Sequence, residues 1–170
     1  LNLDAWKIAS GEINNFLMLD HIIKKSNKPI ILSTGLSDEK EIKKTLHFIK
    51  SKLYKKKLKN ELSLLQCNSQ YPTHVSKVGH KIIQILKKKF KLITGLSDHS
   101  GNINSLISGI TLGAKILEFH VTFDKKFFGP DVNSSITFEE LNFLSKFNND
   151  YHEILNSNFK TKKISKNLLK

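Results

Sequence analysis

Short apolar runs alternate along the chain with longer segments whose apolar residues recur at helical spacing. Because the short runs show little polar alternation, they predict strands that are buried on both faces of a parallel sheet. Five strand-and-helix units make an α/β fold. The predicted strands are WKIAS around Lys7, PIILSTG from Pro29, ELSLLQC from Glu61, FKLITGLS from Phe90 and AKILEFHV from Ala114. The predicted helices between them are NNFLMLDHIIKK, SDEKEIKKTLHFIKSKL, VGHKIIQILKKKF and INSLISGITLG.

Capping residues support these helix boundaries. Ser37 or Asp38 is predicted to cap the second helix, whose first turn carries acidic residues. Thr137 and Glu140 have the spacing of a capping box at the start of a last helix, FEELNFLSKF. We therefore predict one domain over residues 1–150, with a helix end and a basic linker over residues 151–170.

Small or reactive residues follow every predicted strand. In a barrel of parallel strands all these ends surround one opening, where active sites are built, whereas an open sheet concentrates its chemistry at one switch point. The chain also lacks the glycine-rich phosphate motifs of many open sheets. A βα barrel of the TIM type is therefore favoured. The strand ends are Ser10, Gly11 and Glu12; Ser33, Thr34 and Gly35; Cys67, Asn68 and Ser69; Ser97, Asp98 and His99; and Glu118, Phe119 and His120.

Two histidines, His99 and His120, lie at the ends of consecutive predicted strands. Imidazole suits divalent first-row metals, and carboxylates or substrate oxygens could complete the coordination. Asp98 and Glu118 lie beside them, where an acid could fix the imidazole tautomer. The alternative is that these histidines only form hydrogen bonds.

Other strand ends suggest an anionic substrate. Lys7 lies in an apolar strand, where its ammonium group could hold phosphate or carboxylate or form a Schiff base. The alternative is exposure to solvent, which is more common for a lone lysine that flanks a strand. Ser10 and Gly11 at the same edge offer hydroxyl and N–H donors. Asp131 lies in a Gly-Pro turn, and the single cysteine, Cys67, is expected to be a small buried residue.

The net charge suggests an alternative class of protein. The 170 residues carry a net charge of +13, which would suit a nucleic-acid-binding module. All 28 basic residues are lysine, however, and base recognition usually needs arginine. No apolar run reaches 18 residues and the first residues lack the pattern of a secretion signal, so a cytoplasmic location is predicted.

Six ordered motifs resemble the sialic acid synthase family, over about residues 4–148: KIASGEINNFLMLDHI, KPIILSTGLS, LLQCNSQYP, GLSDHSG, GAKILEFHVTFDK and GPD. The resemblance implies a (β/α)8 barrel with its active site at the C-terminal ends of the strands, and a divalent ion, Mn²⁺ or Mg²⁺. It also implies residue roles. His99 and His120 would bind the metal; Lys7, Ser10, Ser69 and Ser97 would bind phosphoenolpyruvate; Tyr71 and Asp131 would meet the sugar; and Glu12 and Glu118 would orient groups or handle protons.

The family condenses phosphoenolpyruvate with an N-acetylated amino-sugar aldehyde, which gives a nonulosonic acid and phosphate. By this resemblance the five predicted strands correspond to strands 4–8 of the barrel. The first three strands and a C-terminal antifreeze-like domain are then absent, and we expect the segment alone to be inactive. An inactive remnant of such a synthase is the alternative. A homodimer is expected for the intact protein.

Overall fold

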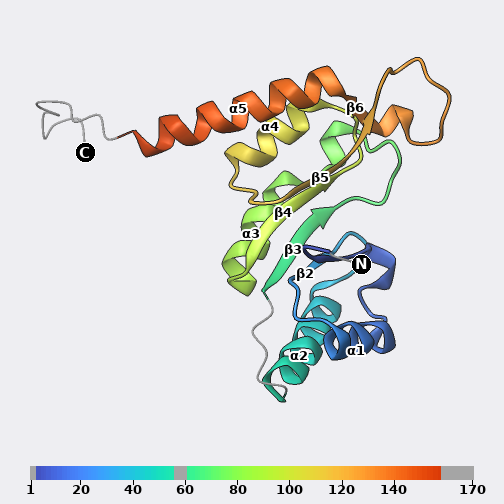
Figure 1. The fold of residues 1–170 in the computed structure, drawn as a ribbon, viewed down its shortest axis with the longest axis vertical. Helices are drawn as coiled ribbons and strands as arrows, with labels where there is room; N and C mark the ends of the chain where they lie inside the picture. Colours follow the sequence, from blue (N-terminus) through green and yellow to red (C-terminus); the bar gives the residue numbers. More distant parts are fainter. Residues whose placement is uncertain (1–2, 56–60, 158–170) are drawn as a thin grey trace, which may run out of the picture.

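The computed structural model describes residues 3–55 and 61–157. Six parallel strands form one sheet in chain order, with helices along one side of it (Figure 1). The α/β interpretation is therefore confirmed. The strands are β1 (Trp6–Ile8), β2 (Ile30–Ser33), β3 (Leu62–Cys67), β4 (Ile93–Asp98), β5 (Leu117–Thr122) and β6 (Ser135–Thr137).

Five α-helices connect or follow the strands. Figure 1 shows α1 and α2 beside the first strands and α5 beside the last. The sequence predicted all five. They are α1 (Phe16–Lys25), α2 (Glu39–Lys55), α3 (His80–Phe90), α4 (Ile103–Thr111) and α5 (Phe138–Asn156). The basic linker predicted after α5 lies largely in residues 158–170, outside the described residues.

The predicted count of five strands was wrong, because the sequence pattern missed β6. Its three residues alternate between polar and apolar and lead directly into the cap of α5 at Thr137. The connection from β5 to β6 contains a short 3-10 helix, Val132–Ser134, and no α-helix. The alternation of strand and α-helix therefore did not predict a strand at this place.

The two faces of the sheet have different chemistry. Side chains alternate along a strand, and the face toward the helices is apolar: Ile8, Ile30, Leu32, Leu62 and Leu64 form one buried cluster with residues of α1, α2 and α3. The parallel register places the residues between them on the other face, where Lys7 pairs with Ile31 and Ser97 with Glu118. Polar residues on this second face can therefore share one side of the sheet.

Helix caps form as the sequence predicted. The Asp38 side chain accepts a hydrogen bond from the Glu41 amide at 2.8 Å, so Asp38 and not Ser37 caps α2. Thr137 and Glu140 form the reciprocal capping box of α5. Within residues 3–55 and 61–157, no helix combines the length and the apolar character that a membrane crossing requires.

Gly95 lets β4 and the segment before β5 approach each other closely. A Cβ atom at this position would lie 2.2 Å from the Ile116 carbonyl oxygen, which is the acceptor for the Leu96 amide. A side chain here would therefore push apart the two strands that carry the histidines.

We expect Gly95→Ala to lower the free energy of unfolding by at least about 2 kcal/mol, because the backbone must move to admit the methyl group. Urea unfolding followed by circular dichroism measures this. Gly11→Ala is the matched control, since a Cβ atom there meets nothing within 4 Å; its effect should stay within about 0.5 kcal/mol. Equal stability of the two variants would contradict the close-packing argument.

Candidate active site

A cavity of about 330 Å³ lies at the C-terminal ends of the strands. It brings together side chains from β1, β4 and β5 and from the segment after β3. Eight of the ten predicted site residues line it: Lys7, Ser10, Ser69, Tyr71, Ser97, His99, Glu118 and His120. Residues separated by more than one hundred positions in the sequence thus share one space.

The His99 ring is held in a defined orientation. It is 7% exposed, and its Nδ1 lies 2.8 Å from the Asn68 carbonyl oxygen. Because a carbonyl oxygen can only accept, Nδ1 carries the proton, and in the neutral ring Nε2 keeps a free lone pair. The Tyr71 hydroxyl donates to Nε2 at 3.0 Å, and the two rings stack with centroids 4.0 Å apart. The nitrogen able to bind a metal therefore lies beside the tyrosine hydroxyl.

His120 lies within β5, inside the predicted strand AKILEFHV. Its ring centroid is 5.4 Å from that of His99. A metal–nitrogen bond of about 2.1 Å places an imidazole centroid about 3.3 Å from the ion, so two ligating rings lie at most about 6.6 Å apart. The observed spacing fits two ligands to one ion. Among the described residues, no three His, Cys, Asp or Glu side chains converge in this way.

Asp98 does not support the histidines, which corrects the hypothesis that it fixes an imidazole tautomer. Its carboxylate accepts hydrogen bonds from the Ser100 amide and hydroxyl and from the Ser105 hydroxyl. It therefore holds the start of the segment that leads to α4. The backbone carbonyl of Asn68 has the orienting role that the acid was expected to have.

Lys7 and Glu118 form an ion pair across the cavity, with 3.0 Å between Nζ and Oε1. Both side chains remain partly accessible, at 33% and 40%. The second carboxylate oxygen of Glu118, Oε2, is buried and has no hydrogen-bond partner among the described residues. An ammonium group and a carboxylate with unused bonding capacity thus face the same space.

Hydroxyl groups complete one wall. The Ser97 hydroxyl lies 3.5 Å from Nε2 of His99, and the Ser10 hydroxyl accepts from the Gly35 amide at 3.1 Å. Sequence reasoning noted Ser33 as a strand end but gave it no role. In the structure Ser33 lines the cavity, and its buried hydroxyl has no hydrogen-bond partner within residues 3–55 and 61–157. The available signal was its position two residues after Ile31. Ser33 therefore lies on the same face of the sheet as Ile31, which pairs with Lys7.

Two predicted residues lie outside the cavity wall. The Glu12 carboxylate accepts from the Asn15 side chain at 2.8 Å and is exposed. Asp131 lies 4.0 Å from Nδ1 of His120, within ion-pair range but beyond hydrogen-bond length. The Glu12 carboxylate therefore lies at the same edge but is bonded to Asn15, at the start of α1. Asp131 approaches the cavity from the β5–β6 connection.

Cys67 is buried, as expected, but it also lines the cavity, with its sulfur 4.0 Å from Nδ1 of His99. Burial alone would raise the pKa of the thiol, but hydrogen bonds with His99, Ser10 and Ser97 bring that pKa below its ordinary value. Burial by itself would lower the pKa of His99, because it disfavours the charged ring, but the contacts with Cys67 and the Asn68 carbonyl raise that pKa. The pair stabilises the charged form of both groups.

The arrangement combines a cation, several hydroxyl donors and two imidazoles in one cavity. Cationic and hydroxyl groups suit phosphate and carboxylate oxygens, and paired imidazoles suit a divalent metal. The cavity therefore has the chemistry to hold an anionic reactant next to a metal-bound one.

Comparison with known proteins shows that this chain belongs to the NeuB family. Residues 1–160 match the NeuB family. The chain is 40% identical over 144 residues to the N,N'-diacetyllegionaminic acid synthase of Campylobacter jejuni, covering 85% of the chain and 42% of that protein. It is 38% identical over 138 residues to the pseudaminic acid synthase of the same species, covering 80% of the chain and 38% of that protein.

A solved structure agrees. The N-acetylneuraminic acid synthetase of Leptospira borgpetersenii, crystallised with citrate, superimposes with a TM-score of 0.80 at 30% identity, over 99% of this chain and 56% of that one. The chain thus spans less than two thirds of the length of each of these proteins. Its six-stranded parallel sheet corresponds to part of a TIM barrel.

We expect Cys67→Ser to lower the pKa of His99, because a serine hydroxyl does not become an anion beside the imidazolium. Titration of the His99 ring protons by NMR measures this shift. Ser51→Ala, which removes a hydroxyl bonded to the Phe48 carbonyl on α2, is the control and should leave the titration of His99 unchanged. A His99 pKa that stays the same or rises in Cys67→Ser would contradict the assigned contact.

Proposed function

Because the chain belongs to the NeuB family, we propose that it carries the reactant-binding and metal-binding part of a nonulosonic acid synthase. The reaction would condense phosphoenolpyruvate with an N-acetylated amino-sugar aldehyde. The observation that carries the proposal is that Lys7, Ser97 and the two histidines share one cavity. The names of the legionaminic and pseudaminic acid synthases support the same class of product.

The proposed anion site is built around Lys7. An incoming phosphate or carboxylate would replace Glu118 as the partner of its ammonium group, while the hydroxyls of Ser10, Ser33 and Ser97 supply donors. Ser33 adds a buried hydroxyl that otherwise lacks a hydrogen bond. With an anion in place, Lys7 acts as a clamp and has no need to form a Schiff base.

His99 and His120 are the residues that would hold a divalent ion such as Mn²⁺ or Mg²⁺. The donor set fits, because the Asn68 carbonyl fixes the proton of His99 on Nδ1 and leaves Nε2 facing the cavity. When bound, the ion supplies Lewis acidity that polarises the aldehyde oxygen. Two protein ligands leave coordination positions for oxygen atoms of a substrate.

The proposed reaction forms a carbon–carbon bond and releases phosphate. The terminal alkene carbon of phosphoenolpyruvate forms a bond to the aldehyde carbon, whose oxygen takes up a proton. Water adds to the cationic centre at the neighbouring carbon, and phosphate leaves by cleavage of the bond between that carbon and oxygen. Glu118, once released from Lys7, is placed to accept a proton from the water, and holding the reactants in one cavity raises the rate of their encounter.

Tyr71 and Asp131 are proposed to meet the sugar, since Tyr71 is half exposed at the mouth of the cavity and Asp131 approaches from the loop after β5. Glu12 is proposed to orient groups at the same edge. A cytoplasmic location and a homodimer of the intact protein belong to the proposal as well. An inactive remnant of such a synthase stays the alternative, and a measured activity would exclude it.

A chimera tests the proposal. Residues 4–148 would replace the matching segment of the Campylobacter jejuni legionaminic acid synthase, which supplies the remainder of a barrel. We expect phosphate release from phosphoenolpyruvate that depends on an added sugar, with N-acetylmannosamine and 2,4-diacetamido sugars as the panel.

In this chimera Lys7→Met should lower kcat/KM by about 100-fold or more, because the charged clamp is lost. Lys81→Met, an exposed lysine of α3 outside the cavity, is the matched control and should change kcat/KM by less than about twofold. A folded chimera without sugar-dependent phosphate release, or equal losses in both variants, would contradict the proposal.

His99→Ala should weaken Mn²⁺ binding to the chain by about 100-fold or more, since one of two protein ligands is removed. Isothermal titration calorimetry and the Mn²⁺ electron paramagnetic resonance signal measure it. His47→Ala, an exposed histidine of α2, should leave the affinity unchanged. Mn²⁺ affinity that is the same in both variants would remove His99 from the metal site.

A further inference from the structure

A second cavity, of about 520 Å³, lies at the opposite end of β4. Its wall combines the end of α3, the start of β4 and the segment that leads into β5. Six of its lining residues are Lys87, Lys91, Leu92, Ile93, Thr94 and Lys115. Along β4, Thr94 and Ser97 are three residues apart, about 10 Å, so this cavity is separate from the candidate active site.

Three lysines line this cavity, and no acidic residue is among the residues that line it. None of Lys87, Lys91 and Lys115 forms an ion pair with the described part of the chain. Like charges gathered around a hollow repel one another, and a wall of one sign attracts a counter-ion. The lysines would therefore stabilise an anion in this cavity.

A buried hydroxyl at the same wall also lacks a partner. Thr94 is 1% exposed, and its Oγ1 forms no hydrogen bond with the described residues. A buried hydroxyl without a partner is unfavourable unless something occupies its bonding position. A bound oxygen atom would satisfy it, which is an indication independent of the lysines.

The helix end explains only part of the cluster. Lysines in the last turn of α3 interact favourably with the helix dipole, so Lys87 has a structural reason to be there. Lys115 lies on a different segment, before β5, and the dipole of α3 does not account for it. Lys91 has a left-handed backbone, with φ of 53°, which glycine adopts more easily; a lysine here adds charge at the cost of conformational strain.

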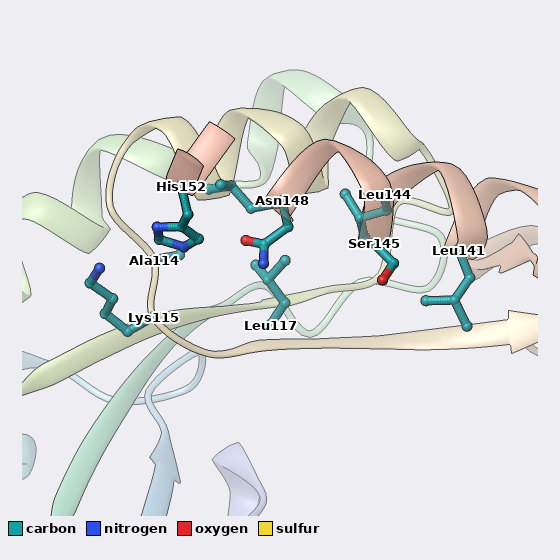
Figure 2. A pocket seen from close by; sticks show the side chains of 9 residues that line it. Ala114, Lys115, Leu117, Leu141, Leu144, Ser145, Asn148 and His152 are labelled. Carbon is teal, nitrogen blue, oxygen red and sulfur yellow. The ribbon is translucent and has the colours of Figure 1, made fainter. Parts of the chain in front are cut away.

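The neighbouring cavity under α5 lacks these features. Figure 2 shows it lined by Leu117, Leu144, Asn148 and His152, with Lys115 at one end. No residue of its lining has a buried polar atom without a partner. The indication of a ligand is therefore specific to the lysine-lined cavity.

We propose that the lysine-lined cavity binds a small multivalent anion that carries phosphate groups. Three ammonium groups match a doubly or triply charged oxyanion, and the Thr94 hydroxyl supplies a directed hydrogen bond. Leu92 and Ile93 add apolar surface for a less polar part of the same ligand. The site is independent of the proposed catalytic function.

Calorimetric titration of the chain with inorganic pyrophosphate at low salt tests this site. Lys87→Gln with Lys115→Gln should weaken binding about tenfold, and Thr94→Val should weaken it about threefold. Lys81→Gln with Lys88→Gln, two exposed lysines of the same helix that do not line the cavity, is the charge-matched control and should change the affinity by less than about twofold.

Backbone NMR locates the bound ion, with the amides of Thr94 and Gly113 expected to shift on addition of pyrophosphate. Equal losses in the two double variants would mean attraction to the overall charge of +13 and would overturn the site. Loss of all binding in Lys7→Met would place the ion in the candidate active site and overturn it too. If the Lys87 and Lys115 double variant does not fold, the nearly isosteric Thr94→Val decides the question by the same titration.

Discussion

The candidate site depends on the register of the parallel strands. Cys67 pairs with Ser97, and Ser97 pairs with Glu118, so three strands present their reactive side chains in one row. A shift of one residue in any pair would turn these side chains toward the apolar helix layer. The register is fixed because the alternate residues, such as Leu64 and Leu96, are fully buried against the helices. The apolar core on one face thus positions the chemistry on the other.

Much of this arrangement was predictable from the sequence, because periodicity and strand ends carry the necessary signals. The apolar runs located five strands, and the polar residues that follow them pointed to a shared edge. The shortest strand, β6, was missed because three residues with mixed polarity do not form a pattern. Ser33 was passed over for a related reason: a hydroxyl after an apolar run looks like a turn residue until the register places it beside the cavity.

Contacts between distant backbone and side-chain atoms were beyond sequence reasoning. The carbonyl that orients His99 belongs to Asn68, 31 residues earlier, and no residue type predicts a backbone acceptor. The segment after β3 is held there by its own bonds: the Asn68 side chain donates to the Lys77 carbonyl, and the Thr73 amide donates to the His99 carbonyl. The same segment carries Tyr71, so Nε2 of His99 and the tyrosine hydroxyl are positioned together.

The ion pair between Lys7 and Glu118 connects this geometry with the proposed chemistry. Both side chains are partly exposed, so the pair contributes little to stability, and exchanging one partner for another costs little free energy. An entering anion can therefore take the ammonium group of Lys7 and release the carboxylate of Glu118. That carboxylate stays near the histidines on the same face of the sheet, where a proton acceptor is needed once water attacks. In the proposed function, occupation of the anion site would thus also free the base, because both depend on the single weak ion pair between Lys7 and Glu118.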